Sequence, residues 1–574
     1  MRHKQFSRRV LLQSAATIGS AAAVSGVLPG TALAASASAD GDRKNNRDTV
    51  VATDNGAIVE TVYGKVRGFT RNGIYIFKGI PYGASTDGKN RFMPPQKPEP
   101  WPGIRSALYY ERVSPQPPRE SWNHDENAFL FHWDDGQPGE DCLRMNVWTP
   151  GINDNRKRTV MVWMHGGGYV AGSGQELAAY EGESLAHRGD VVVVSMNHRL
   201  GTFGFLNLAE VGGDRYTSSG NVGMIDLVFA LEWVRDNIAN FGGDPKSVMI
   251  FGQSGGGGKV NTLMAMPSAK GLFRRAAVQS GSLLRVGDPH DSYELASAVL
   301  KQLNISASNV DQLQSVPTDQ LLLAATTAQR SLMPPRNPNA PPVNFRHLGR
   351  QLGWQPVVDG KVIPQQIWDP AAPQLSADVP LLVGSVLNEF VTAMDQPDAF
   401  SMTNEELSKK IGATYGSDKS KEIIDAFRTG HPEANLFQLY SIISVASVRE
   451  TAIKQAQLKA ALAQAPAFLY WFTWQTPILN GRPMAFHCAD LSFCFDNSDR
   501  CETMTGGGSR ARALGAKMSQ AWIEFAKKGD PNHGGLPHWA PVSADKVPTM
   551  IFDDACEAKE YPDRLEQKVM DSIG

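Results

Sequence analysis

Short apolar segments alternate with helical patterns through the middle of this chain, and few folds accommodate that order. Residues 159–164 and 191–196 are rich in β-branched side chains and show no polar–apolar alternation, a pattern typical of strands buried on both faces of a parallel sheet. Residues 222–240 carry apolar side chains at helical spacing, and another strand pattern follows at 247–251. Strands joined by helices in this way predict an α/β domain with a central, mostly parallel sheet flanked by helices.

The segments on either side extend this prediction. Over residues 57–101, short apolar runs broken by Gly and Pro indicate a small N-terminal antiparallel sheet. A further strand is expected at 276–279, mainly helical structure at 404–465 and an amphipathic helix at 511–528. Residues 332–343 contain five prolines, which indicates a semi-rigid surface loop.

The beginning of the chain has a different composition. Residues 1–34 hold four basic residues within the first nine positions, followed by a weakly apolar, Ala-rich stretch that ends in small residues. This is the pattern of an export signal, and Ser7-Arg8-Arg9 resembles the twin-arginine export motif. The alternatives are a disordered tail and a membrane anchor, but polar residues interrupt the roughly 20 apolar positions that an anchor needs.

We therefore expect an exported protein, periplasmic or secreted, with no stable membrane insertion after the signal is cleaved. Residues 35–56, rich in small and polar side chains, are predicted to be a linker. Length alone would allow two or three domains, but large α/β enzymes often exceed the average domain size. One α/β domain over residues 57–574 is the prediction.

Charge and cysteine content exclude other classes of protein. The formal net charge is −2 and becomes −6 once the four basic residues of the signal are removed, whereas a protein that binds nucleic acid needs a clustered basic surface. Five cysteines in 574 residues do not make a disulfide scaffold. We expect no nucleic-acid partner, and the function must depend on other side chains.

The segment Gly252-Gln253-Ser254-Gly255-Gly256 matches the pattern G-x-S-x-G. A buried strand pattern leads into it and a helical pattern at 259–266 follows, which is the context of a nucleophile elbow. In such an elbow the serine takes strained backbone dihedrals and is exposed at the start of the helix. A phosphate loop is excluded because Gln253 replaces its first glycine and Val260 its Ser or Thr. Ser254 is thus a candidate nucleophile.

The segment His165-Gly166-Gly167-Gly168 directly follows the strand predicted at 159–164. Acyl transfer develops negative charge on the former carbonyl oxygen, and preorganised backbone N–H donors stabilise that charge. Glycines let the backbone approach this oxygen because they have no side chain. An ordinary glycine-rich turn is the alternative, but H-G-G-G is the form that this loop takes in lipases and esterases.

A serine nucleophile needs a base, and the base needs a carboxylate to orient it. In α/β-hydrolases the three follow in the order nucleophile, acid, histidine, but the chain contains 12 histidines and order alone does not select one. A zinc cluster at Cys488, Cys494 and Cys501 is not expected, because these cysteines lack the C-x₂₋₄-C spacing of such sites.

Several segments together resemble the type-B carboxylesterases, the family that includes cholinesterases and bacterial para-nitrobenzyl esterases. The two glycine-rich segments above belong to this resemblance, which extends from about residue 57 to 552. The other matching segments are FKGIPYG at 77–83, RFMPP at 91–95, EDCLRMNV at 140–147, NHRLG at 197–201, FGGDP at 241–245, QSGS at 279–282 and WIEFA at 522–526. The resemblance implies an α/β-hydrolase fold and hydrolysis of carboxylic esters.

The resemblance also implies the partners of Ser254. The family places its acid in a segment of the form Gly, a few residues, then Asp-Glu-Gly, after a strand, which here implies Glu389 as the acid. Its histidine lies in H-x-x-E/D-L, which implies His487 as the base. The further residues that it implies are Gly167, Gly168 and Gly255 as N–H donors of an oxyanion hole, and Arg199 and Asp226 as a buried structural ion pair. No metal and no organic cofactor are implied.

Four positions depart from the family pattern. Gln253 stands where Glu is usual, Gly255 where Ala is usual and Asn388 where Asp is common; these differences affect the surroundings of the site and leave the three catalytic positions intact. Ser114 stands where the family has the cysteine that pairs with Cys142. The resemblance therefore predicts that Cys142 is a free, buried thiol.

The predicted function is hydrolysis of a small-molecule carboxylic ester through an acyl-serine intermediate. Amide, carbamate or thioester hydrolysis, and acyl transfer to another alcohol, use the same groups and are alternatives. A binding protein that keeps the fold without catalysis is a further alternative, against which all three catalytic positions are present.

Overall fold

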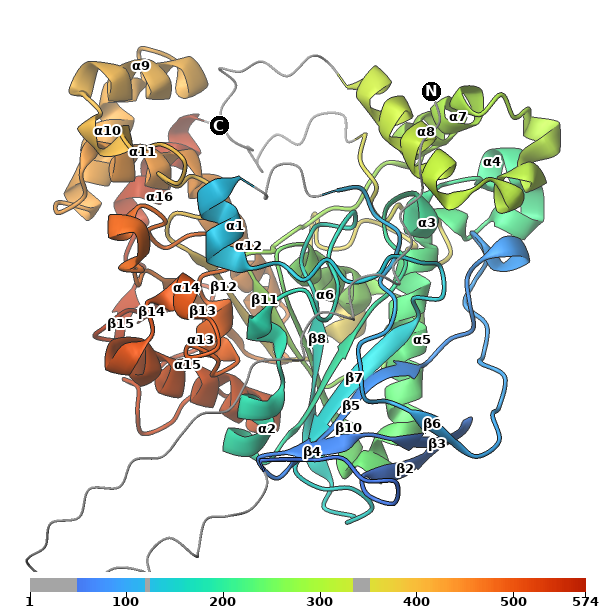
Figure 1. The fold of residues 1–574 in the computed structure, drawn as a ribbon. Coiled ribbons are helices and arrows are strands. Elements are labelled where there is room, and N and C mark those ends of the chain that lie inside the picture. The colour runs from blue at the N-terminus through green and yellow to red at the C-terminus, as the bar shows by residue number, and fades with distance from the viewer. Residues whose placement is uncertain (1–48, 119–123, 334–351, 574) are drawn as a thin grey trace, which may run out of the picture. The chain divides into compact units, whose positions relative to one another are not determined.

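The computed structural model describes residues 49–118, 124–333 and 352–573. The predicted export signal at 1–34, and all but the first two residues of the predicted proline-rich loop, lie outside these residues. Within the described residues, most strands belong to one large sheet with helices on both faces (Figure 1).

The large sheet is parallel in its centre and antiparallel at its edges. Its order over the described residues is β1-β4-β5-β7-β9-β8-β10-β11-β12-β13-β14-β15, and all neighbours from β9 to β14 are parallel. The parallel strands are β8 (Arg158–Met164), β9 (Val192–Met196), β10 (Gly243–Gln253), β11 (Arg275–Gln279), β12 (Leu381–Val386), β13 (Ala467–Phe472) and β14 (Pro548–Phe552). The antiparallel strands are β1 (Val50–Val51), β4 (Phe69–Arg71), β5 (Ile74–Pro81), β7 (Arg144–Thr149) and β15 (Glu557–Glu560).

A small second sheet lies in the N-terminal part of the domain, as predicted. It pairs β2 (Ile58–Thr61) with β3 (Gly64–Arg67) in antiparallel register, and β6 (Ile104–Ser106) adds to β3 in parallel. The strand β1 falls inside the stretch 35–56, which the sequence indicates as linker, yet it pairs with β4 at the edge of the large sheet. Two residues are too few to show the alternation that reveals a strand in a sequence.

The hydrophobic core is divided by the large sheet into two clusters. Val160 and Val162 of β8 pack in one cluster, and Met161 and Trp163 in the other, because successive side chains of a strand point to opposite faces. The first cluster includes residues of α5 (Val222–Asn237) and α6 (Gly255–Ala265), and the second includes residues of α2 (Glu183–Gly189) and α15 (Gly508–Lys528). These helices cover the two faces (Figure 1).

The helical segments predicted from the sequence are present. The region 404–465 forms α9 (Asn404–Tyr415), α10 (Ser420–Gly430), α11 (Leu436–Ser444) and α12 (Ala446–Ala461). The remaining α-helices of the described residues are α1 (Asp125–Phe131), α3 (Gly201–Phe205), α4 (Ala209–Gly212), α7 (Pro289–Gln302), α8 (Thr318–Leu332), α13 (Leu491–Cys494), α14 (Glu502–Thr505) and α16 (Arg564–Ile573).

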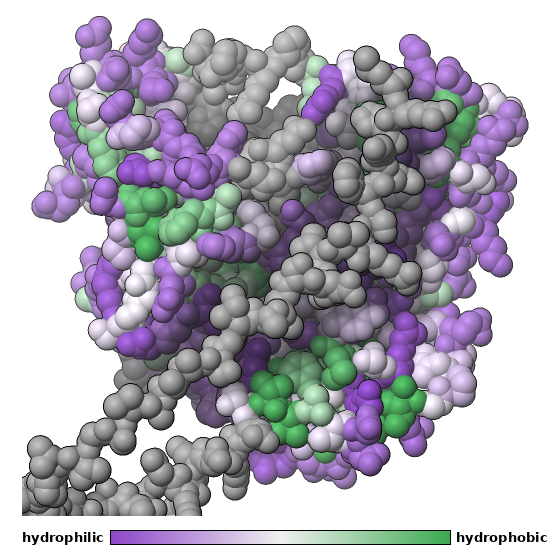
Figure 2. Space-filling model, viewed as in Figure 1, coloured by the Kyte–Doolittle hydropathy of each residue, from purple (hydrophilic) through white to green (hydrophobic). Residues whose placement is uncertain are grey.

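The surface seen in Figure 2 is mainly hydrophilic, and its hydrophobic patches are small and separate. Among the helices that the structure describes, none combines the length and the apolar character that crossing a bilayer requires.

Candidate active site

Ser254 lies in a tight turn between β10 and α6. Its backbone has φ 57° and ψ −125°, a strained conformation for a residue with a side chain. The Ser254 N–H donates to the carbonyl of Gln279 in β11 at 2.8 Å, and the Ser254 carbonyl accepts from Gly258 N–H at 3.1 Å. A Cβ on Gly256 would overlap the carbonyl oxygen of Met164, so only glycine lets the helix begin this close to β8. The predicted strand–serine–helix elbow is therefore present.

Glu389 and His487 meet beside this turn. Glu389 follows β12, and its Oε2 lies 2.5 Å from His487 Nδ1. The His487 N–H also donates to the Glu389 carbonyl at 2.8 Å, and Glu389 Oε1 accepts from the N–H of Val386 at 3.1 Å. Both side chains are buried, Glu389 with 1% and His487 with 4% of its surface exposed. A carboxylate on Nδ1 favours the tautomer with its proton there, which leaves the Nε2 lone pair available.

The hydrogen bond expected between His487 and the Ser254 hydroxyl is not formed. His487 Nε2 lies 3.0 Å from Gln253 Nε2, and among the hydrogen bonds of the described residues none joins His487 to Ser254 Oγ. The other end of the amide, Gln253 Oε1, accepts a weak hydrogen bond from the Cys488 thiol at 3.4 Å. The structure thus brings the predicted acid and the predicted base into contact, and the Gln253 amide lies at the imidazole nitrogen that the proposed serine would need.

The glycine-rich loop after β8 contacts the first turn of α6. Gly167 and Gly168 have φ 79° and 64°, which side chains rarely adopt. The Gly167 carbonyl accepts from the N–H groups of Val170 and Ala171, which closes a turn. A Cβ on Gly255 would overlap Gly168. The three glycines predicted as oxyanion donors therefore lie in two backbone segments that contact each other next to Ser254.

A cavity of about 420 Å³ opens at Ser254. Of the residues that line it within the described part of the chain, none carries a charge. They are Gly168, Tyr169, Val170, Ser254, Gly255, Ser280, Gly281, Ser282, Leu283, Met333, Leu352, Gly353, Trp354, Gln355, Phe390, Val448 and Thr451. Apolar walls with a few polar groups near a reactive atom are typical of small-molecule sites.

Phe390 is a site residue that the sequence reasoning missed. Its ring centroid lies 3.9 Å from that of His487, with 32° between the ring planes, and 41% of its surface is exposed. The signal for it was available, since Asn388-Glu389-Phe390 stands where the family pattern reads Asp-Glu-Gly.

Two other predictions from the resemblance are confirmed. Arg199 and Asp226 form a fully buried pair with two side-chain hydrogen bonds, of 2.8 Å and 2.6 Å. Cys142 is a free, buried thiol, and the other four cysteines are also unpaired. Burial raises the pKa of the Cys142 thiol to about 12, so it is inert at neutral pH.

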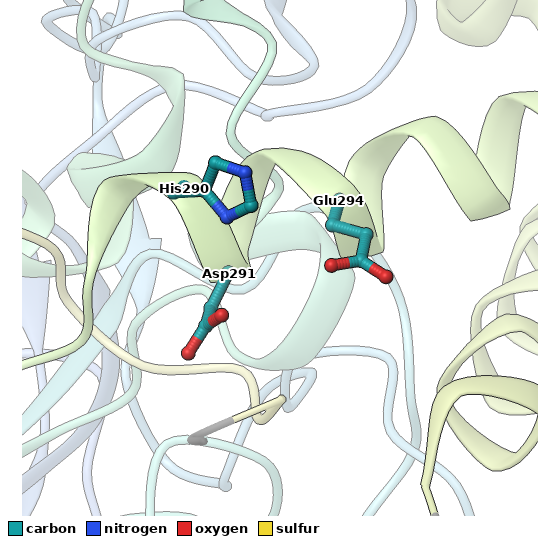
Figure 3. Close-up of side chains that lie close together, drawn as sticks. All are labelled: His290, Asp291 and Glu294. Atoms are coloured by element: carbon teal, nitrogen blue, oxygen red, sulfur yellow. The ribbon is translucent and has the colours of Figure 1, made fainter.

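One group of possible metal ligands lies elsewhere, on α7. Side-chain atoms of His290, Asp291 and Glu294 lie within 4.8 Å of one another on the first turns of this helix (Figure 3). Neighbouring side chains on a helix surface come this close without a ligand, and none of the three lines the cavity at Ser254. We give this group no role in catalysis.

Comparisons with known proteins agree with the fold. Residues 55–569 match the model of the carboxylesterase family. The chain is 33% identical to a para-nitrobenzyl esterase of Bacillus subtilis (strain 168), over 90% of this chain and 99% of that protein. A solved structure of a Clostridium hathewayi esterase, described as able to hydrolyse aliphatic aromatic polyesters, superposes with a TM-score of 0.77 at 32% identity, over 92% of this chain and 99% of the other. A Geobacillus stearothermophilus carboxylesterase gives a TM-score of 0.72 at 31% identity, over 89% and 99%.

The chain belongs to the carboxylesterase family. It has the α/β-hydrolase fold and is a carboxylic ester hydrolase of the serine esterase type, as the sequence predicts.

Proposed function

We propose that this esterase acts through an acyl-serine intermediate on Ser254, with His487 as general base and Glu389 as the residue that orients the base. The observation that carries the proposal is the 2.5 Å contact between Glu389 Oε2 and His487 Nδ1 beside a strained serine that lines the cavity. Strain at a residue open to a ligand is characteristic of functional sites.

The first step is attack by Ser254 Oγ on the ester carbonyl, while His487 Nε2 takes the hydroxyl proton. This transfer requires the Gln253 amide, which lies 3.0 Å from Nε2, to give way to Ser254 Oγ. His487 then carries a positive charge, which the buried Glu389 carboxylate stabilises. The protonated His487 gives its proton to the departing alcohol, and water, activated by the same histidine, releases the acid from Ser254.

The negative charge of the tetrahedral intermediate develops at the start of α6. The N–H groups of Gly167, Gly168 and Gly255 are the proposed donors to it. Gly168 and Gly255 line the cavity together with Ser254, which supports this assignment. Backbone donors held in place before the reaction stabilise such charge without reorganisation.

The described lining residues of the cavity carry no charge, which favours neutral esters with an apolar acyl or alcohol part. A charged group would lose its hydration there without gaining an opposite charge from the described lining residues. The lining includes the aromatic residues Tyr169, Trp354 and Phe390, which favour an aryl group because aromatic pairs attract each other. Amides, carbamates and thioesters of the same shape would use the same catalytic groups, and their relative rates distinguish these classes.

We also propose that residues 1–34 direct export by a twin-arginine route, because paired arginines precede a weakly apolar stretch. The mature chain would act outside the cytoplasm. Its formal net charge of −6 opposes binding to nucleic acid. Replacing Arg8 and Arg9 by Lys would keep the charge and leave the protein inside the cell; unchanged export would contradict this route.

The test of the catalytic proposal is a rate comparison across neutral and charged nitrophenyl esters, for the wild type and Ser254→Ala. We expect Ser254→Ala to lower kcat by roughly 10⁶ if the three residues act as a unit. We expect wild-type kcat/KM to be higher for neutral aryl or alkyl acyl groups than for acyl groups that end in a carboxylate. Activity of Ser254→Ala close to that of the wild type would contradict the assignment.

A further inference from the structure

A fully buried lysine lies under the glycine-rich loop. Lys259 belongs to α6, the helix that starts directly after Ser254, and none of its surface is exposed. Its Nζ donates a hydrogen bond of 2.9 Å to the carbonyl oxygen of His165. His165 is the residue immediately before Gly166, Gly167 and Gly168, so the bond joins the helix of the nucleophile to the base of the loop.

Burial of the charged form of Lys259 costs free energy because the ammonium group loses its hydration. Desolvation lowers the pKa of Lys259 to about 7, against the attraction of Glu176. Burial also lowers the pKa of His198, with a contribution from the Lys259 charge, and the His198 ring lies 5.2 Å from that of His165. An apolar side chain at this position would avoid the desolvation penalty. The steps proposed for ester hydrolysis do not use the Lys259 amine. We therefore look for its role in the hydrogen bond to the His165 carbonyl.

The loop that Lys259 holds contains three consecutive glycines, so it has little conformational restraint of its own. Gly167 and Gly168 both have positive φ, and glycines lose more conformational freedom on ordering than other residues. On its other side the loop is held locally, by the Val170 and Ala171 N–H groups on the Gly167 carbonyl. The bond from Lys259 fixes the preceding peptide to a rigid helix.

We propose that Lys259 is a positioning residue for the oxyanion hole. By tying the His165 carbonyl to α6, it keeps the N–H groups of the loop at a fixed distance from the N–H of Gly255, which begins the same helix. This inference rests on the proposed role of Gly167, Gly168 and Gly255. It predicts that loss of the Lys259 amine weakens binding of the transition state more than binding of the substrate.

The test compares Lys259→Met, which keeps the apolar stem and removes the amine, with Lys459→Met. Lys459 is the matched control because it is also buried, with 1% of its surface exposed, and also donates to backbone carbonyls, those of Ser376 and Ala377. It lies near the end of α12 and does not line the cavity. The measurements are kcat and KM for a nitrophenyl ester, the inhibition constant of an aryl trifluoromethyl ketone, and the melting temperature.

We expect Lys259→Met to lower kcat by about 10- to 100-fold, the cost of a displacement of about an ångström, with KM changed less than about twofold. The trifluoromethyl ketone forms a tetrahedral oxyanion on the serine, so its binding should weaken by a similar factor. Lys459→Met should change the melting temperature and leave kcat and the inhibition constant as in the wild type. Lys259→Arg, which keeps a donor, should retain more activity than Lys259→Met.

The proposal is overturned if folded Lys259→Met has wild-type kcat, if only its KM changes, or if Lys459→Met loses kcat equally. If Lys259→Met does not fold, an Lys259→Arg variant that folds but loses kcat by more than about 100-fold overturns it as well. A failure of the catalytic proposal is distinguished by Ser254→Ala, which would then retain activity.

Discussion

Gln253 Nε2 lies 3.0 Å from His487 Nε2, so an amide occupies the imidazole nitrogen that would take the proton of the serine. The contact helps to hold the His487 ring with its Nδ1 toward Glu389. The Gln253 amide is uncharged, whereas a carboxylate at the same place would stabilise the protonated form of His487.

Gln253→Glu should shift the pH dependence of the enzyme. A carboxylate beside His487 Nε2 stabilises the protonated ring, which cannot act as a base, so the acid limb of kcat/KM should move to higher pH by about one unit. The measurement is the pH profile of kcat/KM for a neutral ester. Gln253→Met, which has similar length and no charge, is the control and should leave the position of the limb unchanged. If the acid limb of kcat/KM lies at the same pH in the wild type and in Gln253→Glu, the side chain at position 253 has no electrostatic effect on His487.

Glu389→Gln should remove most of the catalytic rate while leaving substrate binding nearly intact. The amide keeps the shape of the side chain but neither fixes the tautomer of His487 nor stabilises its positive charge, a loss of about 10⁴ in kcat in a comparable triad. Steady-state kinetics at a pH above the acid limb measure it, with circular dichroism to establish the fold. A reduction of less than tenfold would mean that another group orients the base.

Phe390→Ala should weaken binding of aryl esters more than of acetyl esters. The ring packs against His487 in a tilted arrangement and lines the cavity. An aromatic pair contributes about 0.5–1.5 kcal/mol, or roughly 2- to 10-fold in kcat/KM. Phe400→Ala is a matched control because Phe400 is similarly exposed, at 38%, and does not line the cavity. Equal effects of the two substitutions on the aryl-to-acetyl ratio would exclude a specific role of Phe390.

Glu566→Gln should stabilise the protein above pH 7. Burial, together with nearby Asp563, raises the pKa of Glu566 from 4.5 to about 7. Between these values the native state holds a proton that the unfolded chain has released, so stability falls as pH rises through this range. The amide of Glu566→Gln does not titrate, so this variant does not lose stability through this group as pH rises. Melting temperatures at pH 5 and pH 8 should therefore differ less in Glu566→Gln than in the wild type, and equal differences would contradict the buried, protonated carboxyl.

The parts of the site that lie close together in the sequence could be predicted from it. The elbow at Ser254 and the loop at Gly167 each follow a buried strand directly, and both the strand and the turn leave a local pattern. Glu389 and His487 come from separate loops that tertiary structure brings together, so only the family resemblance implies their roles. The departure at Phe390 is visible in the sequence, but the contacts of Phe390 with His487 and of Lys259 with His165 depend on side-chain direction and on distant segments, which no local pattern encodes.

The most direct test of the central claim is covalent labelling with a nitrophenyl phosphonate, followed by mass spectrometry of the digested protein. Phosphonates react with a serine that is activated by a base and stabilised by oxyanion donors. We expect one stoichiometric adduct on Ser254 in the wild type, and no adduct in Ser254→Ala. An adduct on a different serine, or an active enzyme that remains unlabelled at Ser254, would contradict it.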